Sequence, residues 1–321
     1  MRKTMMKAAL AALGVGLVSQ PVLAQEKLKV ATTFLGLWDT SQPTLCKERG
    51  EFAKAGLDVD VTSTRGGSEN IQAVIAGGMD IGYSPGINAV FAAYAQGNKL
   101  KVVSSEFLGQ NDTFFYVPAD SPIKSTKDLN GKTVAFPRPG GASEATLLAF
   151  KNESKLDFKM VATGGMDATM TMAMTKQVDV GYAIPPSGLA AIEEGKIRVL
   201  FSGDDVKAQA KLTGRVIVTK ADFLEKKRAV VAKFLETLDK CIDWAYANKK
   251  ESSKFYGDLN KVDAKIAEKG IAFYDRKTLA FGPIEGLDVV MKQAVDAKFL
   301  AKPLTEAEIK DLIDIVYTTK K

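Results

Sequence analysis

Residues 128–143 read DLNGKTVAFPRPGGAS. Residues 132–136 are rich in strand-forming side chains, and glycine or proline stands at both ends of this run. Helix-forming residues follow at 142–150, so we expect a strand, a tight turn and a helix whose first free N–H groups point back at the strand end. Such N–H groups and the positive end of the helix dipole favour an anion or a polar acceptor. Arg138 in this turn offers a bidentate donor for a carboxylate, sulfonate or phosphate, or it simply faces water.

The same pattern of strand, turn and helix recurs along the chain. Strands alternating with helices at this spacing predict parallel βαβ units. The series breaks off at Pro118 and then begins again, which predicts two α/β lobes. After residue 220 the pattern is helical, with a capping box at Thr305-x-x-Glu308 opening the last helix. The expected strands are residues 28–33, 57–62, 79–83, 100–104, 114–117, 132–136, 158–161, 178–182, 197–201 and 215–219.

The turns that follow these strands define a candidate ligand cleft. In open α/β sheets, ligands bind beyond the carboxyl ends of the strands, where helix N-termini converge. Trp38, at the exit of the first strand, is either a stacking wall for a ligand or a side chain that packs beneath its loop. The candidate ligand-binding residues are Phe34, Gly36, Trp38, Arg65, Ser84, Pro85, Arg138, Gly140, Gly141, Ser143, Tyr182 and Pro185.

The first 24 residues have the plan of a cleavable signal peptide. Arg2, Lys3 and Lys7 precede an apolar run, and the segment closes with small residues at Ala24. We therefore expect export to the periplasm. Removal of this segment takes away three of the 44 basic residues and none of the 38 acidic ones, so the net charge changes from +6 to +3. No long basic cluster is present, and we expect no nucleic-acid partner.

The chain contains no histidine and only two cysteines. The lack of histidine excludes Ser-His-Asp and Cys-His triads and histidine-ligated metal sites. We accordingly expect no catalytic residue, no metal and no cofactor. Cys46 and Cys241 are either a disulfide that closes a long loop or two buried thiols, and the sequence leaves both interpretations open.

Four segments resemble the periplasmic solute-binding proteins of nitrate/sulfonate/taurine-type ABC importers. In chain order they are EFAKAGL at 51–57, QAVIAGGMDIG at 72–82, DSPIKSTKDLNGKTVA at 120–135 and KQVDVG at 176–181. The resemblance implies the type II periplasmic binding fold, in which two α/β lobes joined by two crossing strands enclose a ligand cleft. It divides the chain into residues 25–117 for the first part of lobe one, 118–214 for lobe two, and 215–321 for the completion of lobe one and the C-terminal helices.

The resemblance also implies a function and partners. We expect a monomer that captures a small organic anion, such as a sulfonate, a taurine-like compound or a carboxylate, and delivers it to an ABC permease and ATPase. The bulky Phe34 and Trp38 depart from many members of the family and disfavour a tiny ion such as nitrate. Alternatives are a receptor for a thiamine-type pyrimidine or other heterocycle, and a ligand-binding sensor protein. Related pyrimidine-synthase enzymes rely on a histidine that this chain lacks.

Overall fold

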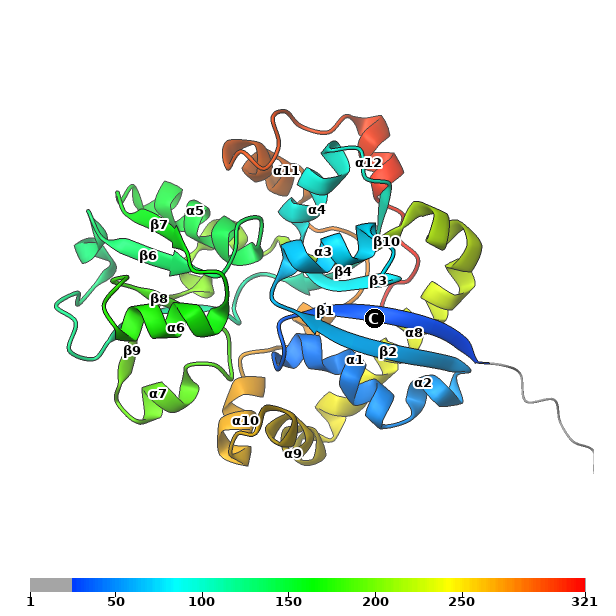
Figure 1. Cartoon of the computed structure of the whole chain (residues 1–321), viewed down its shortest axis with the longest axis horizontal. Helices are drawn as coiled ribbons and strands as arrows, with labels where there is room; N and C mark the ends of the chain where they lie inside the picture. Colours follow the sequence, from blue (N-terminus) through cyan, green and yellow to red (C-terminus); the bar gives the residue numbers. More distant parts are fainter. Residues whose placement is uncertain (1–24, 321) are drawn as a thin grey trace, which may run out of the picture.

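The chain forms two α/β lobes that lie side by side (Figure 1). The structure is a computed structural model and describes residues 25–320; the expected signal peptide, residues 1–24, lies outside them. The alternation of strands and helices predicted from the sequence is confirmed in both lobes. No helix within the described range is both long and apolar enough to cross a bilayer.

The first lobe is built on a five-stranded sheet of order β2-β1-β3-β10-β4. β1 runs parallel to β2 and β3, whereas β10 is antiparallel to β3 and β4. In β2, Leu57 and Val59 are buried while Asp58 and Asp60 are exposed, which is the alternation of a half-buried strand. The elements are β1 (Glu26–Thr33), α1 (Trp38–Glu48), α2 (Glu51–Lys54), β2 (Leu57–Thr64), α3 (Gly67–Ile75), β3 (Ile81–Gly86), α4 (Ile87–Ala95), β4 (Leu100–Leu108) and β10 (Thr213–Lys220).

The second lobe contains a three-stranded sheet, β8-β5-β9, and a parallel pair, β6-β7. A bridge between Val134 and Val180 links the pair to the sheet beside β8. Its elements are β5 (Phe114–Pro118), η1 (Thr126–Leu129), β6 (Thr133–Phe136), α5 (Ala142–Ser154), β7 (Lys159–Ala162), α6 (Met166–Met174), β8 (Gly181–Ala183), α7 (Leu189–Glu193), β9 (Ile197–Ser202), η2 (Gly203–Asp205) and η3 (Lys207–Gln209).

The first passage between the lobes precedes β5. All five residues of β5 are buried, and the strand pairs with β8 and β9 of the second lobe. The strand expected at 114–117 therefore belongs to the second sheet, where β8 and β9 pair with its backbone on both edges. The chain crosses between the lobes at residues 109–113 and returns at residues 203–212.

The helices after β10 complete the first lobe and also touch the second. Lys269 of α10 forms an ion pair with Glu193 of α7. The Tyr256 hydroxyl donates a hydrogen bond to the Pro185 carbonyl at 3.2 Å. These elements are α8 (Ala221–Ala247), α9 (Lys249–Asn260), α10 (Ala264–Ile271), η4 (Arg276–Leu279), α11 (Leu287–Asp296) and α12 (Glu306–Leu312).

A disulfide joins Cys46 of α1 to Cys241 of α8, with the two Cα atoms 5.6 Å apart. Of the two interpretations that the sequence left open, the disulfide is the one found. The bond spans 195 residues of sequence, although both helices belong to the first lobe. A cross-link over such a long loop removes much conformational entropy from the unfolded chain.

Replacing both cysteines by alanine should lower the free energy of unfolding by about 2–5 kcal/mol, the usual effect of removing a native disulfide. Urea denaturation of the oxidised wild type and of the double variant measures this difference. Equal unfolding midpoints would contradict a stabilising role for the bond.

Candidate ligand-binding site

A cavity of about 40 Å³ lies where the two lobes meet. Its walls are the ends of β1 and β3 and the turns after β1 and β2 in the first lobe, and the turn after β6 and the end of β8 in the second. One residue of the first crossing segment and one of β10 complete it. The residues that line it are Thr33, Phe34, Leu37, Gly66, Gly67, Ser84, Gly86, Gln110, Pro137, Arg138, Gly141, Ala142, Ser143, Tyr182, Ile184 and Arg215.

Three helices of both lobes begin at this cavity. The residues that precede α3, α4 and α5 are Gly66, Gly86 and Gly141, and none of them caps its helix with a side-chain hydrogen bond. The first N–H groups of a helix have no partner within the helix. The cavity therefore faces backbone donors and the positive ends of three helix dipoles, an arrangement that favours an anion.

Arg138 is half-buried and makes no ion pair with any residue between 25 and 320. Its Nε is buried and has no hydrogen-bond partner in the same range. A side chain at Gly66 would crowd Arg138 Cδ, with 3.2 Å between that atom and the added Cβ. The glycine thus leaves room for the arginine to reach across from the second lobe.

Arg215 forms the floor of the cavity and is 5% exposed. Its Nη1 donates to Asp39 Oδ2 at 2.7 Å and its Nη2 donates to Asp112 Oδ2 at 2.5 Å. The guanidinium also lies over the ring of Phe107, 4.0 Å from the centroid. Arg215 is not among the residues predicted from the sequence, because the prediction rested on turns and this arginine lies within the strand β10.

Glu106 is a buried carboxyl group beside this ion-paired cluster. Neither of its oxygens has a hydrogen-bond partner among the described residues. Burial and the neighbouring Asp39 carboxylate raise the pKa of Glu106 to about 8, against an ordinary value of 4.5, although Arg215 acts in the opposite direction. Burial also raises the pKa of Asp112. Charging Glu106 therefore opposes folding.

Two cavity residues adopt left-handed backbone conformations that are unusual for their side chains. Phe34 has φ +46° and Ser84 has φ +69°. The conformation at Ser84 is held by local hydrogen bonds: its carbonyl accepts from Thr33 Oγ1 at 3.2 Å and its hydroxyl donates to Asp39 Oδ2 at 3.1 Å. Strained residues of this kind cluster at functional sites.

The cavity adjoins a larger outer chamber of about 950 Å³. Phe34, Leu37 and Arg138 line both spaces. Leu35, which is 73% exposed, and Met166 add apolar surface to the chamber. Polar side chains, among them Arg65, Asp167 and Asn260, line the chamber beside this apolar surface.

The twelve residues predicted from the sequence fall in three places. Six of them line the inner cavity: Phe34, Ser84, Arg138, Gly141, Ser143 and Tyr182. Gly36 and Arg65 line the outer chamber, where Arg65 is exposed and pairs with Glu69 at 3.1 Å. Trp38, Pro85, Gly140 and Pro185 do not border either space. Gly140 packs instead against Ser68 and Ala89 of the first lobe, and Pro185 faces Tyr256.

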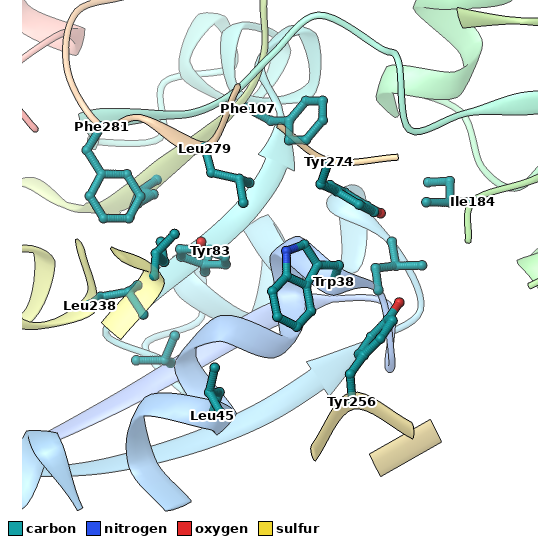
Figure 2. Close-up of a cluster of buried hydrophobic side chains, with 14 of the residues drawn as sticks. Trp38, Leu45, Tyr83, Phe107, Ile184, Leu238, Tyr256, Tyr274, Leu279 and Phe281 are labelled. Atoms are coloured by element: carbon teal, nitrogen blue, oxygen red, sulfur yellow. The ribbon is translucent and has the colours of Figure 1, made fainter. Parts of the chain in front are cut away.

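Trp38 lies in the core, so the hypothesis that it forms a stacking wall for a ligand is wrong. Of the two interpretations of this residue, packing beneath its loop is the one found. Figure 2 shows Trp38 within a cluster of buried side chains that includes Tyr256 and Tyr274. It is 0% exposed, donates its indole N–H to the Tyr246 hydroxyl at 3.0 Å, and meets the Tyr256 ring edge-on. The helix α1 begins at this residue and turns the side chain towards α8 and α9, while Leu37 borders the cavity.

Backbone groups of the second lobe contact the first lobe across the cleft. The Ser68 hydroxyl donates to the Pro139 carbonyl at 2.8 Å. A Cβ at Gly86 would lie 2.9 Å from the Ala142 nitrogen and 3.3 Å from the Gly141 carbonyl carbon. The start of α4 and the start of α5 therefore meet only because residue 86 is a glycine.

Two lobes joined by two crossings, with a polar cavity between them, define a solute-binding protein of the periplasmic binding type. Residues 44–252 match the family described as NMT1/THI5 like. The chain therefore belongs to the NMT1/THI5-like family, as the motifs predicted, and it is a binding protein.

Similarity to known proteins agrees with this assignment. The chain is 29% identical over 173 residues to an aliphatic sulfonates-binding protein of Escherichia coli K12, an alignment that covers 53% of the chain and only about half, 52%, of that protein. The crystal structure of the periplasmic aliphatic sulphonate binding protein SsuA from Escherichia coli superposes with a TM-score of 0.73 at 19% identity, covering 92% of this chain and 94% of that one. A ligand-binding component of an ABC-type import system from Staphylococcus aureus gives 0.69 at 14% identity, covering 91% and 97%. These likenesses confirm the α/β periplasmic binding protein fold.

Glu106→Gln should flatten the pH dependence of stability. In the folded chain Glu106 keeps its proton up to about pH 8, whereas the unfolded chain releases it near the ordinary value of 4.5. The wild type should therefore lose stability as the pH rises from about 5 to 8, with a slope of up to about 1.4 kcal/mol per pH unit from this group. Urea titrations at several pH values measure the slope. The exposed Glu48→Gln serves as control, and an unchanged slope in Glu106→Gln would refute the assignment.

Gly86→Val should hold the lobes apart, because its side chain would overlap the start of α5. Small-angle X-ray scattering should give a larger radius of gyration than for the wild type under conditions in which the wild type is closed. Gly78→Val is the matched control, since a Cβ there meets nothing closer than 3.6 Å. Superimposable scattering curves for Gly86→Val and wild type would show that this contact does not limit closure.

Proposed function

We propose that the protein is the solute-binding component of an ABC importer, which captures a small organic anion in the periplasm and delivers it to a membrane permease and its ATPase. The family and fold support a binding role of this kind. The expected signal peptide and the disulfide between Cys46 and Cys241 support an oxidising compartment outside the cytoplasm. The sulfonate-binding relatives make sulfonates and carboxylates the first ligands to examine.

The observation that carries the proposal is Arg138, a half-buried guanidinium without an ion-pair partner among the described residues, at a cavity where three helices begin. Withdrawing a charge from water without giving it a partner is costly, so a half-buried cation at the cavity favours an anionic ligand. In this proposal Arg138 and the N–H groups at the start of α5 hold the acid group. Ser143 and Tyr182 add hydroxyl donors from the same lobe.

The ligand body would extend from the acid group into the outer chamber. Phe34 borders both spaces and would cover the apolar part of the ligand. Trp38 is buried in the core and would not contact the ligand. Closure of the lobes through the Gly86 contact would then exclude water, which strengthens each charge-assisted hydrogen bond in the cavity. No bond-making step is required.

The burial of Trp38 weakens the alternative of a stacked pyrimidine or other heterocycle, because Phe34 and Tyr182 are then the aromatic residues that line the two spaces among residues 25–320. A sensor protein would use the same ligand cleft. Genes for a permease and an ATPase beside the gene for this chain would favour transport over sensing.

Arg138→Ala should weaken binding of an organic acid roughly 10- to 150-fold, which corresponds to the loss of about 1.5–3 kcal/mol from a charge-assisted hydrogen bond. The ligand is first found by thermal shift of residues 25–321 against sulfonates, taurine, carboxylates and pyrimidines, because a ligand at about 100 times its Kd adds about 2.7 kcal/mol of stability. Isothermal titration calorimetry then compares the variant with the wild type.

Arg228→Ala is the matched control for this measurement. Arg228 lies on α8, its side chain is half exposed, and it pairs with Asp314 on the surface. Its removal should leave the Kd unchanged. Stabilisation by pyrimidines alone, or an Arg138→Ala variant that binds the acid as tightly as the wild type, would overturn the anion proposal.

A further inference from the structure

The helices α9 and α10 form a hairpin that is fixed to the first lobe at both ends. In α9, Tyr256 is 0% exposed and its ring meets Trp38 of α1 edge-on, with 5.2 Å between the ring centroids. Beyond α10, the Tyr274 carbonyl accepts a hydrogen bond from the Tyr246 hydroxyl of α8 at 3.1 Å. Because both ends are attached to the core of the first lobe, α10 is part of that lobe.

The tip of this hairpin, α10, is nevertheless packed on the second lobe, where it lies beside α7 (Figure 1). Ile266 of α10 is 9% exposed and belongs to a buried apolar cluster whose other buried members all lie in the second lobe. Lys269 on the same helix forms an ion pair with Glu193 of α7. A Cβ at Gly270 would lie 3.7 Å from the Pro185 Cβ, so the backbone of α10 also packs on the turn after β8.

The contact between α10 and α7 lies at the outer chamber, on the side of the cleft away from the crossings. From the first lobe, Asn260 and Val262 line the chamber just before α10 begins. From the second lobe, Pro186 and Ser187 line it just before α7 begins. The first crossing segment instead contributes Gln110 to the inner cavity. Rotation of the lobes about the crossings would therefore widen the chamber and separate α10 from α7.

The side chains that make this contact lie outside the ligand site. Ile266, Lys269 and Glu193 line neither the inner cavity nor the outer chamber. The contact can therefore form whether or not a ligand is bound. Ile266 should contribute most to it, because burial of an apolar side chain is favourable in water, whereas the half-exposed ion pair is screened by solvent.

We propose that α10 is a latch that holds the two lobes together without a ligand, so that the free protein in solution is mainly closed. A ligand then enters through the outer chamber and binds a cleft that is already assembled. Its apparent affinity is not reduced by the cost of closing the lobes, since the fraction of the protein that is ready to bind is already high.

Small-angle X-ray scattering of residues 25–321 tests the latch without any ligand. Bound molecules are first removed by dialysis in denaturant and refolding. The wild-type curve should match the curve calculated from this structure. Ile266→Asp places a charge in the apolar cluster, so it should separate α10 from α7 and increase the radius of gyration beyond the difference between repeat measurements. Circular dichroism and thermal unfolding verify that this variant is folded.

A charge swap on the surface gives a second test that leaves the apolar cluster intact. Lys269→Glu places two carboxylates opposite each other and should increase the radius of gyration at low ionic strength, where charges are least screened. Adding Glu193→Lys restores an ion pair of reversed sign and should return the wild-type value. Lys254→Glu is the matched control, because Lys254 pairs with Asp258 within α9 and its reversal should leave the scattering unchanged.

Two results would overturn the latch. One is a ligand-free wild type as expanded as Ile266→Asp. The other is a wild type, an Ile266→Asp variant and a Lys269→Glu variant that give the same closed curve. Because these measurements use no ligand, either result leaves the proposed function and its test at Arg138 unaffected.

Discussion

The bonds of Arg215 to Asp39 and Asp112 connect three segments that are far apart in the sequence. Arg215 lies on the strand that returns from the second lobe, Asp112 lies in the segment that leaves the first, and Asp39 lies in the first turn of α1. All three side chains are buried, so loss of one partner would leave an uncompensated charge at a cost of about 3–5 kcal/mol. The first crossing is thereby fastened to β10 and α1 of the first lobe beside the cavity.

Short-range contacts connect the residues that line the cavity to the cluster of Arg215, Asp39 and Asp112. Asp39 also accepts from the Ser84 hydroxyl, which supports the left-handed backbone of Ser84 at the end of β3. From there the chain passes through Gly86, where α4 meets the start of α5 in the second lobe. Arg138 and Arg215 line the cavity, and the carboxylates of Asp39 and Asp112 bind Arg215 without lining the cavity themselves. Glu106 lies beside this cluster, and its raised pKa makes the stability of the fold depend on pH.

Much of the fold and part of the site could be predicted from sequence. The turn at residues 137–143 borders the cavity as expected, because a strand followed by glycines and helix formers specifies its local geometry within a few residues. Ser84 and Tyr182 were found by the same reasoning about strand ends. Trp38 was not placed correctly, since a pattern of apolar residues does not reveal which face of a helix start turns to the core. Gln110 and Arg215 were missed, because neither lies in a turn between a strand and a helix.

By itself, the sequence determined the order of strands and helices, the division into two α/β lobes, the family and the turn that carries Arg138. These features follow from periodicity, caps and glycine or proline positions, which act over a few neighbouring residues. Only the tertiary structure decided that Cys46 joins Cys241, that Trp38 is buried, and that Arg215 is bound by two carboxylates 176 and 103 residues away. Burial and charge pairing depend on contacts between distant segments, and such contacts exist only once the chain has folded.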